Sequence, residues 1–224
     1  MSNYDINSNP RLVKQFIREY KAEEKKIQNI PNSVLTDFKQ ELLNLGFRFQ
    51  VLNQAESLMP KHKDVVLPIV IKYYKKATLK NEKTYLSGWF HYKGLDEVVP
   101  MLLEDYYSDS SNVDKWAIGD RLYQIRSPKY IDDYIKIVSD SSYGRDRQMV
   151  VLLLGKLKVE EAIPILINLL DDEQVQLHAI IALGQFKREE FRPLFERFQN
   201  SDKSGLRKYA KNALKKLDNN CRKK

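Results

Sequence analysis

Residues 160–186 read EEAIPILINLLDDEQVQLHAIIALGQF and decide the fold. Two apolar segments with helical spacing flank the pair Asp171 and Asp172, and such a polar pair favours a turn. Pro164 stands early in the first segment, where a backbone N–H has no helical partner to lose. The stretch therefore predicts a helical hairpin: a helix that begins near Pro164, a short turn, and a second helix that ends near Phe186.

The same pattern recurs along the chain. The related prolines are Pro68, Pro100, Pro164 and Pro193, at intervals of 32, 64 and 29 residues, and Asp132 occupies the slot that the double interval skips. The second segments align in two apolar columns on one helix face. The first column is Leu86, Ile118, Val150, Ala179 and Ala210, and the second is Phe90, Leu122, Leu154, Leu183 and Leu214. One hairpin cannot bury such a face alone, so we expect stacked hairpins that share a continuous core. Gly155 and Gly184 lower helix propensity, and we expect them where neighbouring helices approach closely.

These features resemble the HEAT repeat family, most closely over 144–217. The resemblance implies an all-α fold: a right-handed α-solenoid of about five HEAT-like helical hairpins with an N-terminal helical cap. The expected boundaries are 1–63 for the cap, 64–217 for the repeats (approximately 64–94, 95–126, 127–157, 158–186 and 187–217) and 218–224 for a basic tail, in a single compact domain overall. The family has a curved binding surface and no common activity.

The first 63 residues do not follow the repeat. Residues 11–27 read as an amphipathic helix, and Pro31 breaks it. Ser33 can cap a second helix from about Val34 to Leu58, and Pro60 ends that helix. Because repeat arrays need polar ends, we expect this segment to cover the first repeat.

Composition narrows the function class. The chain has 224 residues, 42% hydrophobic and 30% charged, which is typical of a globular protein. It has no apolar run long enough to span a membrane and no start of signal-peptide type. Its single cysteine, Cys221, excludes a disulfide framework and fits a reducing compartment, so we expect a cytoplasmic protein. The histidines His62, His91 and His178 are far apart, and no Cys/His cluster has metal-ligand spacing, so we expect no metal and no cofactor.

A basic column starts the second helices. Its members are Lys83, Lys115, Arg147, Gln176 and Arg207, at intervals of 32, 32, 29 and 31 residues. One interpretation is structural: each basic group binds a carboxylate or carbonyl of a nearby turn. The other is functional: the column lines the concave face and binds an acidic partner, with a break at Gln176.

Trp116 and Asp120 lie four residues apart on one helix face, and Arg145 and Arg147 follow one repeat later. These two segments distantly resemble the alkylpurine DNA glycosylases built from HEAT-like repeats. Their sequences are WAIGD at 116–120 and RQMVVLLL from Arg147. The resemblance implies roles for Asp120, Trp116 and Arg147 near alkylated DNA. In another register Gln148 replaces the arginine. The structural interpretation is that Trp116 packs between helices and that Asp120 pairs with a nearby cation.

Two function classes follow. The first is a non-enzymatic adaptor that binds a protein or peptide on its concave face, through residues of the basic column together with Trp116, Asp120 and Arg145. The alternative is a DNA-binding protein, with or without glycosylase activity. The net charge of +8 points to an acidic partner such as nucleic acid. However, residues 201–224 carry nine basic and two acidic side chains, so most of the excess lies on the last helix and tail. A polar outer face of a terminal repeat explains this excess without DNA.

Overall fold

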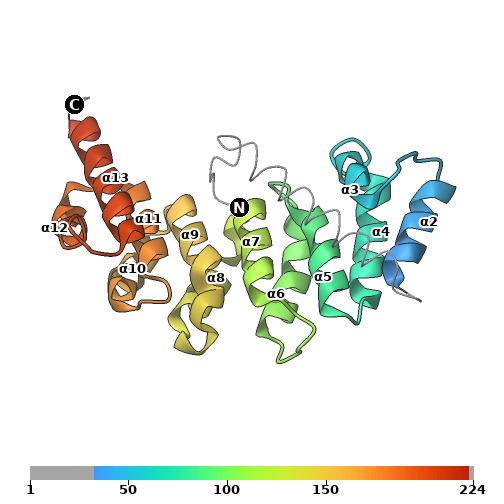
Figure 1. Cartoon of the computed structure of the whole chain (residues 1–224), viewed down its shortest axis with the longest axis horizontal. Helices are drawn as coiled ribbons and strands as arrows, with labels where there is room; N and C mark the ends of the chain where they lie inside the picture. The colour runs from blue at the N-terminus through green and yellow to red at the C-terminus, as the bar shows by residue number, and fades with distance from the viewer. Residues whose placement is uncertain (1–32, 222–224) are drawn as a thin grey trace. The chain divides into compact units, whose positions relative to one another are not determined.

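The computed structural model describes residues 33–221, and their regular structure is helical throughout, without a strand (Figure 1). The expected all-α fold is confirmed. The predicted helix over residues 11–27 and the last three residues of the tail lie outside the described part. The chain divides into two compact units, and the described residues of the first are 33–92 and 108–114. The second unit comprises 93–107 and the residues from Lys115 onward.

Four helices and two 3₁₀ turns make up the described part of the first unit. They are α2 (Val34–Asn44), α3 (Leu52–Ala55), η2 (Glu56–Leu58), α4 (Lys63–Lys76), α5 (Lys80–Ser87) and η3 (Gly88–Phe90). Helix α2 packs against α4, and α4 packs against α5. Phe38 of α2 sits at their centre, because its ring meets Trp89 edge-on at 5.1 Å and Tyr73 at 5.5 Å.

Ser33 caps α2 as predicted. Its Oγ accepts a hydrogen bond from the Leu35 N–H at 3.2 Å, and the same hydroxyl donates to Glu82 Oε1 at 2.7 Å. The single helix expected from Val34 to Leu58 is wrong, however. Helix α2 ends at Asn44, and Gly46 follows with a φ of +90°, which a residue with a side chain rarely adopts.

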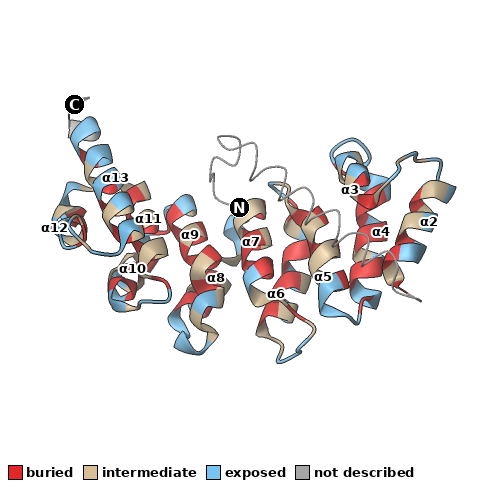
Figure 2. Ribbon diagram, viewed as in Figure 1, coloured by how far each residue is buried: buried red, intermediate tan, exposed pale blue. Residues whose placement is uncertain are grey.

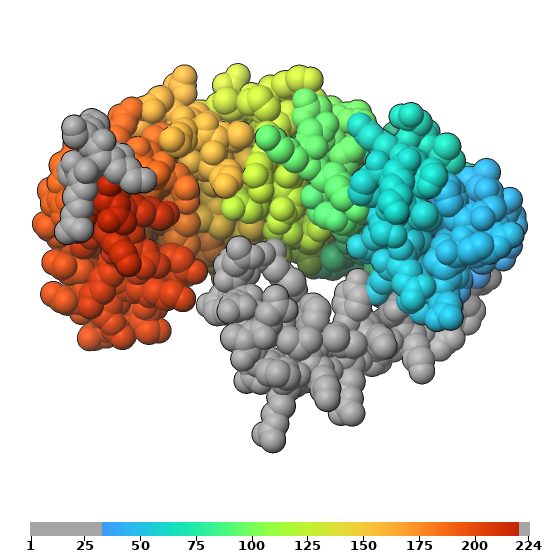
Figure 3. Space-filling view, turned by 90° about the horizontal axis from the view of Figure 1, so that it is seen from above, coloured from blue at the N-terminus to red at the C-terminus, as the bar shows by residue number. Residues whose placement is uncertain are grey.

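The second unit is a stack of helical hairpins that follow one another in chain order (Figures 1 and 3). The hairpins are α6 (Val99–Tyr107) with α7 (Lys115–Ile125), α8 (Ile131–Ser139) with α9 (Gln148–Leu157), α10 (Ile163–Asn168) with α11 (Gln176–Phe186), and α12 (Arg192–Glu196) with α13 (Ser204–Cys221). The second helices pack on one another, α7 on α9, α9 on α11 and α11 on α13. This arrangement is the α-solenoid that the repeats predict.

Each first helix of the second unit is preceded by a 3₁₀ turn. These turns are η4 (Asp96–Val98), η5 (Pro128–Tyr130), η7 (Glu160–Ala162) and η9 (Glu189–Phe191), and two further 3₁₀ segments are η6 (Ser141–Arg147) and η8 (Leu169–Asp171). Pro164 and Pro193 occupy the first turns of α10 and α12, where the missing N–H leaves no helical bond unmade. Pro68 instead lies inside α4.

In the second unit, the members of the two apolar columns form the core that the stacked second helices share, and Figure 2 colours buried positions red. The members of both columns are buried, with the exception of Leu214, which is half-buried in the last helix. Gly155 of α9 lies against α11 so closely that a Cβ there would come within 2.4 Å of the Ala182 Cα. The close approach expected at this glycine is confirmed.

The second helices also end alike. Arg126, Lys158 and Lys187 follow α7, α9 and α11, and each has a φ between 55° and 58°. These left-handed residues close the helices where glycine is the commoner choice. Their cationic side chains stand where the helix dipole is negative, which favours a basic residue at this position. Across residues 33–221, no helix combines the length and the apolarity needed to cross a membrane.

Candidate binding surface

In the second unit, the side chains of the basic column form hydrogen bonds inside the protein. Each member donates to a backbone carbonyl at or just beyond the end of the preceding first helix, where the last carbonyls have no helical partner. The bonds run from Lys115 Nζ to the Tyr106 carbonyl (2.6 Å), from Arg147 Nη1 to Val138 (3.1 Å), from Gln176 Nε2 to Leu170 (2.5 Å) and from Arg207 Nη1 to Ser201 (2.5 Å). These hydrogen bonds agree with the structural interpretation, in which each side chain of the column binds a nearby turn.

Lys83 holds the matching place in the first unit. Its Nζ lies 5.2 Å from the ring centre of Tyr74 in α4. Lys115 has a similar aromatic setting, with its Nζ 5.8 Å from the ring centre of Tyr106 and 4.9 Å from that of Tyr143. A cation over a ring face is attracted by the ring quadrupole, so both lysines stabilise the joint between two helices.

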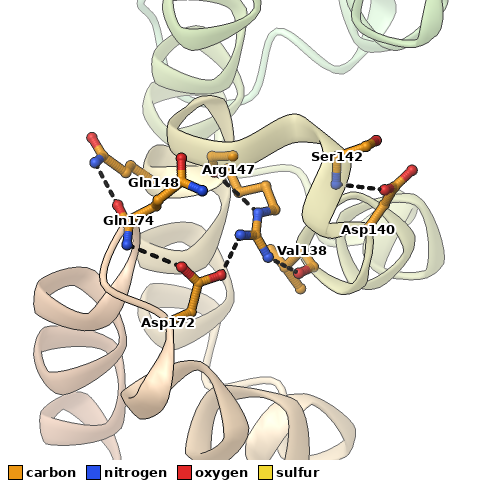
Figure 4. A network of polar contacts seen from close by, with 8 residues as sticks. Val138, Asp140, Ser142, Arg147, Gln148, Asp172 and Gln174 are labelled. Carbon is orange, nitrogen blue, oxygen red and sulfur yellow. Dashed lines mark hydrogen bonds and ion pairs between the residues drawn. The ribbon is translucent and has the colours of Figure 1, made fainter.

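Arg147 is the most deeply placed member of the column, at 1% exposed. Figure 4 shows its guanidinium between Val138 and Asp172. Its Nε donates to the Gly144 carbonyl at 3.1 Å, and its Nη2 contacts Asp172 Oδ2 at 2.5 Å. Asp172 belongs to the next hairpin, where its Oδ1 accepts from the Gln174 N–H at 3.0 Å. The guanidinium thus binds two hairpins together and presents no surface to a ligand.

Asp120 is also buried, at 3% exposed, beside the close contact between α7 and α9. Its Oδ2 forms an ion pair with the Arg121 Nη2 at 2.8 Å. Because Asp120 and Arg147 both lie inside the protein, they do not line an open cleft with Trp116. The burial of both groups gives the glycosylase alternative no support.

Trp116 reaches the surface instead. It is 38% exposed, and among the described residues of the second unit it is the exposed large hydrophobic side chain. Its indole Nε1 donates to Gln148 Oε1 at 3.2 Å, and Gln148 Nε2 donates to the Gln174 carbonyl at 2.7 Å. These three residues, the Trp–Gln row, start α7, start α9 and precede α11. The Trp116 side chain thus reaches from α7 to α9 and remains partly exposed.

Arg145 and His178 belong to the second and third hairpins of the second unit. Arg145 is exposed, whereas His178 is largely buried and its Nδ1 has no hydrogen-bond partner within residues 33–219. Burial, aided by the positive charge of Arg145, lowers the pKa of His178 from 6.5 to about 4. His178 is therefore neutral at physiological pH.

Two members of the Trp–Gln row, Gln148 and Gln174, were not recognised as a surface in the sequence. Glutamine on a helix face carries no chemical signature, and Gln148 entered only as a substitute for Arg147. The informative signal was the interval of 32 residues between Trp116 and Gln148, which places them at equivalent points of successive hairpins. Among residues 33–219, no group of three or more His, Cys, Asp or Glu side chains has the geometry of a metal site.

Comparison with known families agrees with this architecture. Residues 146–172 match the family model of the PBS lyase HEAT-like repeat. This segment of the second unit therefore carries a HEAT-like repeat. The matched segment covers η6 in part, α9, α10 and η8, and so joins the second helix of one hairpin to the first helix of the next. A repeat has no fixed starting point, so this HEAT-like segment is consistent with the hairpins predicted from the prolines. A search of curated proteins finds no match to the chain.

Proposed function

We propose that this HEAT-like repeat protein is a non-enzymatic binding module that engages a protein or peptide partner through the Trp–Gln row. The observation that carries the proposal is an exposed tryptophan held in place by a neighbouring hairpin, with its indole N–H bonded to Gln148. Tryptophan is enriched among the residues that dominate binding energy at protein interfaces. HEAT-like repeats commonly mediate protein interactions, which agrees with this assignment.

The hydrogen bonds of the row favour binding by reducing its entropic cost. A free surface tryptophan loses rotamer freedom when a partner covers it. Here the bonds from Trp116 to Gln148, and from Gln148 to the Gln174 backbone, restrain the ring before a partner arrives. The exposed face of the indole then offers apolar area, and the amides offer donors and acceptors to a polypeptide backbone.

The nucleic-acid alternative lacks comparable support. A main sequence feature behind it was the basic column, which was expected to line the concave face with a break at Gln176. In the second unit, Lys115, Arg147 and Arg207 of that column donate to carbonyls of their own hairpins. Cations engaged in this way contribute little to a phosphate-binding track.

A photocrosslinking amino acid in place of Trp116 tests the proposal. The matched control carries the same amino acid at Lys136, an exposed position on the first helix α8 of the same unit. We expect a discrete crosslinked protein at position 116 and none at 136. Equal crosslinking at both positions, or none at 116, would refute the proposed surface.

The captured partner then allows a quantitative measurement. Trp116→Ala should weaken its binding by about 30-fold, the effect of losing roughly 2 kcal/mol at an interface hot spot, whereas Lys136→Ala should leave the affinity unchanged. Fluorescence anisotropy with labelled duplex DNA at two salt concentrations tests the alternative, since phosphate contacts make binding strongly salt-dependent. Tight, salt-sensitive duplex binding that depends on Trp116 would replace the protein partner by nucleic acid.

A further inference from the structure

Helices α11 and α13 pack side by side at the end of the second unit (Figure 1). Side chains of both helices line a groove of about 420 Å³. Its floor is apolar and includes Ile180, Ile181 and Ala213. Its walls carry three side-chain amides, those of Gln185, Asn212 and Asn219. The ring of Tyr209 and the side chains of Lys215 and Lys216 complete the lining.

Lys215 and Lys216 line this groove, and two further lysines lie near enough to Lys216 to act on its charge. Lys156 lies in the last turn of α9, Lys187 follows α11, and Lys216 lies on α13, at intervals of 31 and 29 residues that repeat the hairpin spacing. Partial burial lowers the pKa of the Lys216 ammonium group, and the positive charges of Lys187 and Lys156 lower it further. Asp218, the acidic residue closest to Lys216 along α13, bonds instead to Arg192 of α12 at 2.8 Å.

Helix dipoles account for only part of this cluster. Lys156 and Lys187 stand at helix C-termini, where a cation stabilises the helix. Lys216 lies more than a turn inside α13, which ends at Cys221, so this effect is weak there. Holding Lys216 next to two like charges disfavours its charged form in the folded protein, and an anionic ligand would relieve that repulsion.

The amides distinguish between kinds of anionic ligand. Asn and Gln side chains present both a donor and an acceptor, which match the C=O and N–H groups of an extended polypeptide. A phosphate group has only acceptors, and a nucleic-acid backbone would leave the apolar floor uncovered. Ile180 and Ile181 offer a place for an aliphatic side chain, whose burial contributes about 1.5–3 kcal/mol in general.

We infer that the groove between α11 and α13 binds an extended acidic peptide segment, with an aliphatic side chain on the isoleucine floor and carboxylates at Lys187 and Lys216. This inference deepens the proposed function, since it states the chemistry of the partner, but it concerns a different surface from the Trp–Gln row. The lining of α13 runs from Tyr209 to Asn219, about 15 Å along the helix. An extended chain of about five residues covers that length.

The test uses a fluorescein-labelled peptide of about eight residues in which Glu and Leu alternate, so that the two kinds of side chain lie on opposite faces of the extended chain. Anisotropy is measured with the full chain at an ionic strength of about 0.15 M. We expect saturable binding that weakens at least tenfold in Lys187→Glu/Lys216→Glu. The matched control, Lys136→Glu/Lys211→Glu, has the same net charge and alters exposed lysines outside the groove, so its binding should change by less than threefold.

Further probes separate charge from the rest of the groove. A peptide with Gln in place of Glu should lose binding, and a peptide with Ser in place of Leu should bind more weakly. Asn212→Ala should weaken the alternating peptide while leaving net charge unchanged. Circular dichroism melting of each variant establishes that the fold is retained.

Several results would overturn the inference. They are no saturation at millimolar peptide, equal losses in the two double variants, or tighter binding of duplex DNA through the same lysines. A dimer seen by sedimentation that only Lys187→Glu/Lys216→Glu abolishes, without peptide binding, would assign the groove to a second copy of the chain. Trp116→Ala should leave peptide binding unchanged. If crosslinking at position 116 fails while the peptide still binds, only the proposed function is refuted. If crosslinking succeeds while the peptide does not bind, only this inference is refuted.

Discussion

Replacing Gly155 by alanine tests whether the second helices pack through backbone contact. A Cβ at this position would lie 2.4 Å from the Ala182 Cα, 2.6 Å from its Cβ and 2.7 Å from its carbonyl oxygen. Carbon atoms that are not bonded prefer separations of about 3.5–4.0 Å. Because backbone atoms make up most of this contact, no side-chain rotation can relieve it, and α9 must move away from α11.

The size of the effect follows from two opposing contributions. Overpacking of a core generally costs about 1–3 kcal/mol, and a clash with backbone belongs at the upper end of that range. Alanine in place of glycine inside a helix returns about 1 kcal/mol of propensity. The expected net loss for Gly155→Ala is therefore about 2 kcal/mol in the free energy of unfolding.

Gly184→Ala supplies the matched control one hairpin later. A Cβ at Gly184 would lie 3.3 Å from the Ala213 Cβ and 3.9 Å from its Cα, a contact that small shifts can relieve. The propensity gain should then offset the packing loss, to within about 1 kcal/mol. The assay is urea unfolding followed by far-UV circular dichroism for both variants and for Gly155→Ala/Ala182→Gly, which should recover part of the loss. A Gly155→Ala variant as stable as the parent would refute the close packing of α9 on α11.

Four other outcomes follow from the described contacts. Arg147→Met should lower the free energy of unfolding by about 2–4 kcal/mol in urea, because it leaves two carbonyls without their donor and the Asp172 carboxylate without its cation, and Arg147→Lys should lose less. Ser33→Ala should cost about 1–2 kcal/mol in the same assay, since it removes a helix cap that also donates to a buried carboxylate. The pKa of His178 lies near 4 in the folded state and at 6.5 ordinarily, so the unfolded chain takes up its proton first as the pH falls. The free energy of unfolding therefore carries the full contribution of the neutral ring above pH 6.5 and loses up to about 3 kcal/mol of it as the pH falls to 4. Urea titrations at successive pH values should show a weaker pH dependence for His178→Gln than for the parent. Acrylamide should quench the parent more than Trp116→Phe, because Trp116 is 38% exposed and Trp89 is fully buried; equal quenching would contradict that difference.

The helical hairpins could be predicted because the sequence shows both the hydrophobic periodicity of their helices and the length of the repeat. Val150 and Leu154 are buried as their columns require. The failures lie where the pattern carries less information. The helix expected from Val34 to Leu58 breaks at Gly46, since a single glycine can either continue a helix or end it through a positive φ.

The candidate site was predictable in position but only partly in role. The intervals placed Lys115 and Arg147 at the starts of second helices, yet a basic side chain there can face a partner or turn back onto its own hairpin. The choice depends on whether the preceding carbonyl comes within reach, which requires coordinates. The break at Gln176 has a simple physical reason, because a bond to a carbonyl needs a donor and does not need a charge.

The position of each cation changes what the net charge of +8 means for a partner. At the starts of the second helices, Lys115, Arg147 and Arg207 hold carbonyls of their own hairpins, and replacement of that charge by Gln176 preserves the bond. The positive charges of this column serve contacts inside the protein, including the ion pair of Arg147 with Asp172, and are not directed at a partner. Toward the C-terminal ends of the second helices, Lys216 lines the α11–α13 groove, and burial together with the charges of Lys187 and Lys156 lowers its pKa. A partner that recognises positive charge would therefore bind at the C-terminal ends of the second helices, while the N-terminal ends offer an aromatic ring and amides.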